Sequence, residues 1–166
     1  MEVMRKILIF GNSGSGKSTL AKELVVAQGL THLDLDTLAW LPDVPPQRAP
    51  LSESEKKIFQ FIRGNNAWVI EGCYTDLLEL LAPEANEIIF LNLDIEQCVA
   101  NAKNRPWEPH KYSSKQAQDE NLNMLLDWIR QYTARDDVFS FQSHMRFFDN
   151  FPAKKTMYTD NNRNIR

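Results

Sequence analysis

More than any other feature, one octapeptide near the N-terminus constrains the fold of this chain: Gly11-Asn12-Ser13-Gly14-Ser15-Gly16-Lys17-Ser18. The four residues before it, 7–10, are all apolar, which predicts a strand buried on both faces, as in a parallel sheet. Residues 18–27, which follow it, carry Leu20, Leu24 and Ala27 on one side of a predicted helix. A buried strand, a glycine loop and a helix in this order indicate an α/β fold with a mostly parallel sheet.

The octapeptide, called the phosphate loop below, matches G-x-x-x-x-G-K-[ST] at every fixed position. Glycines let consecutive backbone N–H groups converge on phosphate oxygens, and the following helix adds the positive end of its dipole. We expect Lys17 to reach the β- and γ-phosphates of ATP or GTP, and Ser18 to ligate Mg²⁺. No base-specific motif separates ATP from GTP. The residues assigned to the nucleotide are Gly11, Asn12, Ser13, Gly14, Ser15, Gly16, Lys17, Ser18 and Thr19.

The rest of the chain alternates short apolar runs with amphipathic stretches, so residues 1–166 are expected to form a single domain. Further strands are predicted at 31–35, 68–70, 88–91 and 156–158, and further helices at 52–63, 95–102 and 122–133. Residues 42–50 carry four of the eight prolines, which predicts an extended loop.

Acidic residues close two of the predicted strands. Asp34 and Asp36 stand at the end of one, and Glu71 closes the next. Ligands bind at the carboxyl edge of open α/β sheets, and phosphate loops work with an acid near the Mg²⁺. Each acid taken singly has an ordinary alternative as a solvated carboxylate at a strand end. We therefore expect two of the three to be functional.

Composition narrows the possible partners and the compartment. The net charge of −3 argues against duplex DNA as the main ligand, although a local basic patch stays compatible with it. Cys73 and Cys98 form no C-x-x-C pair and no metal-ligand pattern, so reduced core residues are expected. No apolar run approaches the roughly 20 residues that span a bilayer. These features predict a cytoplasmic protein without membrane contact.

Four sequence elements together resemble the shikimate, gluconate and adenylate kinase-like group of P-loop proteins, and more closely small bacterial DNA topology modulation proteins. They are the phosphate loop, Asp34-Leu35-Asp36, Glu71-Gly72-Cys73-Tyr74 and Asn104-Arg105-Pro106. The second resemblance also involves Leu38-Ala39-Trp40 and Trp68-Val69-Ile70-Glu71-Gly72. It implies a five-stranded parallel sheet in the order 2-3-1-4-5 and a lid insertion at about residues 104–117, called the lid segment below.

The resemblance also implies roles for single residues. Asp34 would lie near Mg²⁺, Asp36 would contact the phosphoryl acceptor, and Arg105 would be the lid arginine. An acceptor pocket would contain Asp36, Glu71, Gly72 and Tyr74. Glu71-Gly72-Cys73 stands where shikimate kinases carry three glycines, so shikimate is not the expected acceptor.

Arginines that close over a transferring phosphoryl group stabilise its developing charge. Arg105 lies in a proline-containing loop, and Arg130 and Arg135 lie on or just beyond the last long predicted helix. We assign Arg105 and Arg135 to this role, against the alternative that they are solvated surface charges.

Two functions compete on this evidence. The first is a P-loop kinase that transfers phosphate from ATP (or GTP) to a small-molecule acceptor: a nucleoside or nucleotide, a sugar or a small acid. Its catalytic residues would be Lys17, Asp34, Asp36, Arg105 and Arg135, with Ser18 and Asp34 as metal ligands. The second is a nucleotide-dependent regulator with slow ATPase activity that acts on nucleic acid or a protein partner.

Overall fold

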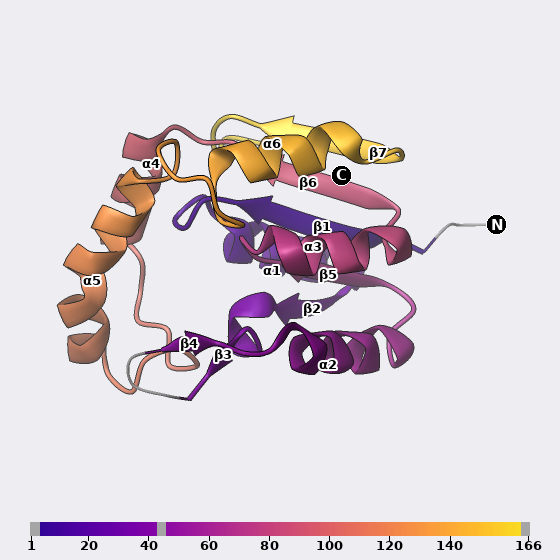
Figure 1. Ribbon diagram of the computed structural model, residues 1–166, viewed down its shortest axis with the longest axis horizontal. Coiled ribbons are helices and arrows are strands. Elements are labelled where there is room, and N and C mark those ends of the chain that lie inside the picture. Colours follow the sequence, from indigo (N-terminus) through magenta and orange to yellow (C-terminus); the bar gives the residue numbers. More distant parts are fainter. Residues whose placement is uncertain (1–3, 43–45, 164–166) are drawn as a thin grey trace.

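The computed structural model describes residues 4–42 and 46–163, and its centre is a five-stranded parallel sheet (Figure 1). The strand order is β2-β5-β1-β6-β7, and all four neighbouring pairs run parallel. Counted along the chain, this is the order 2-3-1-4-5, so the predicted fold class and strand order are confirmed. The strands are β1 (Lys6–Gly11), β2 (Thr31–Asp34), β5 (Trp68–Glu71), β6 (Glu87–Leu91) and β7 (Lys154–Tyr158).

Helices cover both faces of the sheet and complete three layers (Figure 1). One face packs against α1 (Lys17–Gln28), α4 (Ile95–Lys103) and α5 (Lys115–Arg130). The other packs against α2 (Leu51–Arg63), α3 (Thr75–Leu81) and α6 (Phe141–Asn150). Short 3₁₀ helices lie at η1 (Leu35–Thr37) and η2 (Ala82–Glu84).

Strand β1 shows why the central strands read as continuous apolar runs. Ile7 and Ile9 point into the core beneath α1 and α4, while Leu8 and Phe10 point into the core beneath α3 and α6. All four side chains are fully buried. A strand covered on both faces needs apolar residues at every position, because successive side chains point to opposite faces.

Two local predictions need correction. The segment predicted as an extended loop at 42–50 contains part of an antiparallel hairpin, in which β3 (Trp40–Leu41) pairs with β4 (Gln47–Arg48). Residues 43–45 of that segment lie outside the described residues. The helices α3 and α6 had no counterpart in the prediction.

The parallel arrangement brings the functional candidates to one edge. The strands β1, β2 and β5 end at Gly11, Asp34 and Glu71, and Asp34 lies directly beside Glu71 in the register of β2 with β5. Within the described ranges, no helix is both long and apolar enough to cross a membrane.

Candidate nucleotide and acceptor site

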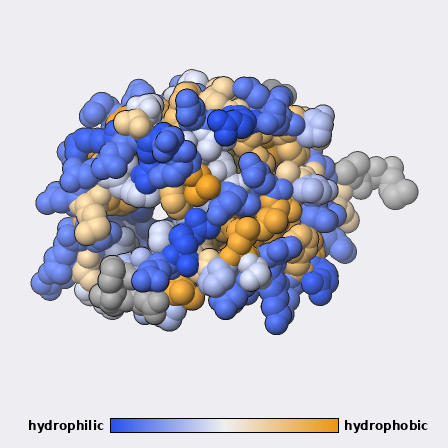
Figure 2. All heavy atoms as spheres, viewed as in Figure 1, coloured by the Kyte–Doolittle hydropathy of each residue, from blue (hydrophilic) through white to orange (hydrophobic). Residues whose placement is uncertain are grey.

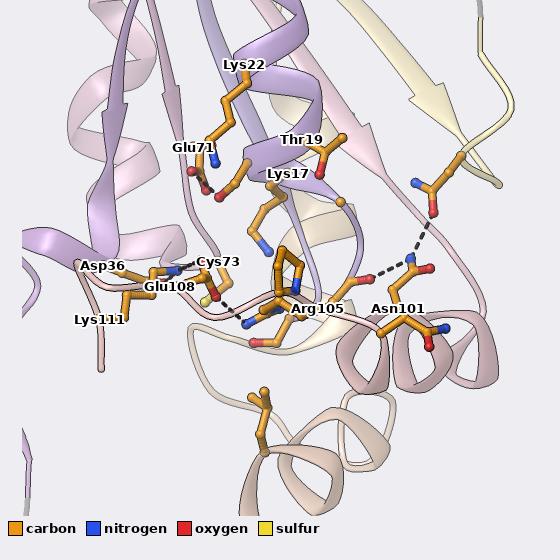
Figure 3. A pocket seen from close by; sticks show the side chains of 18 of the residues that line it. Lys17, Thr19, Lys22, Asp36, Glu71, Cys73, Asn101, Arg105, Glu108 and Lys111 are labelled. Carbon is orange, nitrogen blue, oxygen red and sulfur yellow. Dashed lines mark hydrogen bonds and ion pairs between the residues drawn. The ribbon is translucent and has the colours of Figure 1, made fainter. Parts of the chain in front are cut away.

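A cavity of about 510 Å³ opens at this carboxyl edge. It lies between the phosphate loop and the lid segment, and Figure 2 shows a hollow on this side of the molecule, rimmed mainly by hydrophilic residues. Its walls come from distant parts of the chain: the phosphate loop with the start of α1, η1, the end of β5, α4, the lid segment and the segment after β7. Figure 3 shows residues that line the cavity, and among them Lys17 points into it.

The phosphate loop has the backbone shape that its glycines predict. Gly14 and Gly16 have φ angles of 79° and 94°, in the left-handed region that favours glycine. A Cβ atom at Gly14 would also collide with the backbone carbonyl of Cys98. Lys17 Nζ donates to the carbonyl oxygen of Asn12 at 2.8 Å. A glycine loop closed by a lysine ammonium group, with a helix N-terminus behind it, fits the phosphates of a nucleoside triphosphate.

Ser18 and Glu71 meet at the floor of the cavity. The Ser18 hydroxyl donates to Glu71 Oε2 at 2.7 Å, and His32 Nε2 lies 3.0 Å from the same oxygen. The carboxyl group of Glu71 is buried, with 3% of the side chain exposed, and these two neighbours provide polar contacts for its Oε2 atom. Hydroxyl and carboxylate oxygens are the donors that Mg²⁺ prefers, and the ion usually keeps several waters and phosphate oxygens besides. Ser18 and Glu71 supply oxygens of this kind at the cavity, and Asp34, which lies beside Glu71 in the register of β2 with β5 but does not line this cavity, carries a further carboxylate.

The carboxylates of Asp34, the last residue of β2, and of Asp36, in η1, both lie near the ammonium group of Lys111. Lys111 Nζ lies 2.8 Å from Asp36 Oδ2 and 3.3 Å from Asp34 Oδ2. Burial, together with the charges of Glu71 and Asp36, raises the pKa of Asp34 above its usual value. Burial also acts to raise the pKa of Asp36, but Lys111 and the Tyr74 hydroxyl outweigh it, so that pKa is lowered. Asp36 is therefore the more firmly ionised acid of the pair.

Asp36 is oriented by aromatic residues. The Tyr74 hydroxyl donates a short hydrogen bond to Asp36 Oδ1, and Trp40 Nε1 donates to the Tyr74 oxygen at 2.8 Å. Gly72 lets this part of the chain pass close to η1, because a Cβ atom there would lie 2.8 Å from Leu35 Cβ. The predicted acceptor pocket of Asp36, Glu71, Gly72 and Tyr74 is thus one contiguous region, of which Asp36 and Glu71 line the cavity.

The lid segment supplies the opposite wall. Arg105 Nη1 pairs with Glu108 Oε1 at 3.2 Å, and Glu108 Oε2 lies 3.6 Å from Lys111 Nζ. Arg105, Glu108 and Lys111 all line the cavity. The segment is tied to α5 by Gln118, which accepts from the Glu108 backbone N–H at 2.8 Å.

The other predicted arginine lies elsewhere. Arg135 stacks on the Trp128 ring at 3.3 Å from its centroid and pairs with Asp137 at 2.7 Å. Arg135 is not among the residues that line the cavity. Arg130 is half-exposed and lies 4.0 Å from Asp127.

Several lining residues were not singled out from the sequence: Asn101, Glu108, Lys111, Asn161 and Arg163. Lys111 carried a usable signal, because it stands in the same polar, proline-containing segment as Arg105. Cys73 also lines the cavity, and burial raises the pKa of its thiol to about 12, so it is protonated near neutral pH. Cys73 and Cys98 are both free, as expected.

A buried histidine, His144, contacts the backbone beside the predicted acceptor pocket. His144 Nε2 lies 2.9 Å from the carbonyl oxygen of Cys73, and its Nδ1 lies 2.6 Å from the Tyr132 hydroxyl. Burial lowers the pKa of His144 to about 4, so the neutral ring donates from Nε2 and accepts at Nδ1. This contact fixes the backbone that carries Glu71, Gly72 and Tyr74.

Comparison with solved structures gives the same fold. A gluconokinase from Sinorhizobium meliloti 1021 has a TM-score of 0.54 at 14% identity, covering 98% of this chain and 86% of that one. A shikimate kinase from Bacteroides thetaiotaomicron has a TM-score of 0.50 at 13% identity, covering 94% and 86%. No curated protein matches the chain.

A family model described as the AAA domain matches residues 7–125, which include the phosphate loop, Asp34, Asp36, Glu71 and the lid segment. The match covers more than half of the chain. The protein therefore belongs to this AAA domain family, and its P-loop implies nucleotide binding.

Proposed function

We propose that the protein is a P-loop kinase that transfers the terminal phosphoryl group of ATP, or of GTP, to a small-molecule acceptor. The observation that carries the proposal is a single cavity with two chemically distinct ends. Lys17 and the phosphate loop form one end, and Asp36 with Lys111 forms the other. A simple hydrolase needs no second end.

The chemistry assigned to the first end is charge neutralisation. In our proposal, Lys17 binds the β- and γ-phosphate oxygens, and Ser18, Asp34 and Glu71 hold the magnesium ion directly or through water. The ion supplies electrostatic stabilisation of the phosphates when it is bound. The phosphoryl transfer transition state is loose, so the residues contribute mainly by position and charge.

The second end would hold the acceptor. Asp36 is ionised, and its Oδ1 atom accepts a hydrogen bond from Tyr74. Its Oδ2 atom is paired with Lys111, and it can accept a hydrogen bond from an acceptor hydroxyl when Lys111 moves away. The proton of that hydroxyl then passes to Asp36 as the oxygen bonds to the γ-phosphorus and the bond from that phosphorus to the β–γ bridging oxygen breaks, which releases ADP or GDP. The acceptor classes that fit are nucleosides or nucleotides, sugars and small acids. The fold likeness to a gluconokinase and a shikimate kinase, whose names denote kinases of small molecules, supports this choice.

Arg105 is the arginine proposed to meet the moving phosphoryl group, because it lines the cavity on the lid segment. Arg135, assigned the same role from the sequence, is engaged by Trp128 and Asp137. The proposal therefore gives the transition-state contact to Arg105.

The test has two steps. A thermal-shift screen of nucleosides, nucleotides, sugars and small acids, with a non-hydrolysable ATP analogue present, identifies binders. A ligand at 100 times its dissociation constant stabilises the fold by about 2.7 kcal/mol. ADP release is then measured with each binder, and separately with DNA, RNA and protein.

We expect one acceptor class to accelerate ADP release and to become phosphorylated. Asp36→Asn should abolish this stimulation, whereas Asp119→Asn, a matched change at an exposed position on α5, should not. Stimulation by DNA, RNA or protein alone would instead favour the nucleotide-dependent regulator. The resemblance to small bacterial DNA topology modulation proteins motivates the DNA arm.

A further inference from the structure

Two side-chain amides from distant segments bind backbone carbonyls of the phosphate loop. Asn101, on α4, donates from Nδ2 to the carbonyl oxygen of Gly14 at 2.8 Å. Asn161, after β7, donates from Nδ2 to the carbonyl oxygen of Ser15 at 3.0 Å. Both asparagines line the cavity, and Figure 3 shows Asn101 linked to the loop and to the segment after β7. They hold adjacent carbonyls of the same turn.

The two amides also orient each other. Asn101 Nδ2 uses its second hydrogen to donate to Asn161 Oδ1 at 2.8 Å. Asn101 Oδ1 accepts from Gln97 Nε2 at 2.9 Å, one helical turn earlier on α4. Rotating either amide by 180° would place an oxygen against a backbone carbonyl, which cannot donate. The chain Gln97–Asn101–Asn161 therefore has one favourable orientation.

When these two carbonyls are held, the N–H group that follows each of them is oriented as well. In a trans peptide the C=O and the following N–H point in opposite directions. The Ser15 N–H, on the other side of the peptide from the Gly14 carbonyl that Asn101 holds, donates to the Asn12 carbonyl oxygen at 3.2 Å, so Asn101 supports the turn at residues 12–15. The Ser15 carbonyl held by Asn161 turns the Gly16 N–H away from that amide. Phosphate oxygens bind to backbone N–H groups of such a loop.

The loop needs this support because of its glycines. Gly14 and Gly16 occupy left-handed conformations that a free chain samples among many others. Unless the loop is held, ordering it is a cost that nucleotide binding must meet, and a receptor already held in its bound shape binds more tightly.

We propose that Asn101 and Asn161 are positioning residues that hold the phosphate loop in its binding shape, so that the segment after β7 is part of the phosphate site. The inference rests on the nucleotide binding included in the proposed function. It gives both residues a role that depends on the polyphosphate and is independent of the base.

The test compares Asn101→Ala, Asn161→Ala and the double variant with the parent. Calorimetry gives dissociation constants for Mg-ATP, Mg-GTP and magnesium tripolyphosphate, which has no base. The loss of one net hydrogen bond predicts a weakening of about 3- to 10-fold for each ligand the parent binds. Because the two amides are coupled, the double variant should lose less than the product of the single losses. Asn162→Ala, the same change one residue along, is the matched control.

Weakening that affects ATP or GTP but spares tripolyphosphate would overturn the inference, because it would show contact with the base. Unchanged affinity in both single variants would overturn it too and would leave phosphoryl transfer untouched. The KM for ATP should rise by the same factor as the dissociation constant, whereas a variant that had simply lost its fold would show a large fall in the thermal midpoint. A parent that binds tripolyphosphate but phosphorylates no acceptor would contradict only the proposed function.

Discussion

Lys111 is the residue whose removal tests the electrostatics of the acceptor end most directly. Its ammonium group lies within 4 Å of three carboxylates, those of Asp34, Asp36 and Glu108. In Lys111→Met the aliphatic stem is largely kept and the charge is lost. We expect the fold to be destabilised, because the carboxylates then repel one another with no cation between them.

The magnitude follows from exposure. Removing one partner of a buried ion pair costs about 3–5 kcal/mol, whereas an exposed pair contributes about 0–1 kcal/mol. The Lys111 side chain is 19% exposed, that of Asp34 8% and that of Asp36 37%. The Asp36 contribution is discounted for solvent screening, so we expect a loss of about 2 kcal/mol at pH 7.

The sign of the pH dependence can be worked out. The lowered pKa of Asp36 contributes stability that is present above the unfolded pKa and is lost as the pH falls through the folded pKa. The raised pKa of Asp34 rises further without Lys111, so its penalty applies at neutral pH and is relieved on acidification. The Asp34 part of the difference between parent and variant should therefore shrink as the pH falls from 7 to about 4, whereas the Asp36 part is lost only below about pH 4.

Urea unfolding at both pH values measures this difference. The matched control is Lys115→Met, since Lys115 Nζ lies 2.9 Å from Asp119 Oδ2 but both side chains are exposed. It should cost at most about 0.5 kcal/mol. Equal losses in the two variants, or a Lys111→Met loss that does not change between pH 7 and pH 4, would refute the reasoning.

Four further predictions concern the nucleotide end and the lid segment. Lys17→Ala should abolish tight Mg-ATP binding in a folded protein, and parent-like affinity by calorimetry would contradict the P-loop assignment. Asp34→Asn should weaken magnesium-dependent binding or turnover more than Asp36→Asn, as a magnesium titration of each variant would show. Arg105→Ala should lower turnover at least 10-fold more than ATP affinity, because its contact strengthens in the transition state. Hydrogen exchange of residues 105–117 should slow when an ATP analogue binds, and equal exchange in both states would mark an ordinary surface loop.

The fold was predictable because its strongest signals are local. Short apolar runs predicted the buried strands at 7–10, 68–70 and 88–91, and the family resemblance implied the order of the strands in the sheet. Helix α3 escaped because seven residues give too little periodicity. Helix α6 had a usable signal in Phe141, Met145 and Phe148 at helical spacing, together with Ser140, whose side chain caps it.

The residues of the candidate site likewise fall into two groups: those that a rule of topology could place, and those that depend on distant contacts. Asp34 and Glu71 could be placed because parallel strands end at a common edge, which is a topological rule. Lys111 shares the polar segment of Arg105, but the partners of Lys111 and Asn161 could not be predicted, because they lie 75 and 146 residues away along the chain. Their positions depend on how two irregular segments pack against the finished core, and no periodicity encodes that.

The lid segment joins both ends of the cavity through one acid. Glu108 contacts Arg105 on the phosphate side and Lys111 on the acceptor side, with the two cations on different oxygens of its carboxylate. A displacement of this segment therefore withdraws two positive charges together, one from each end. In the proposed kinase, a bound polyphosphate would attract Arg105 away from Glu108, whose other oxygen would keep its contacts with Lys111 and His110. Competition for Lys111 between Glu108 and Asp36 would free an oxygen of Asp36 for an acceptor hydroxyl, so that nucleotide binding prepares the acceptor end through charge alone.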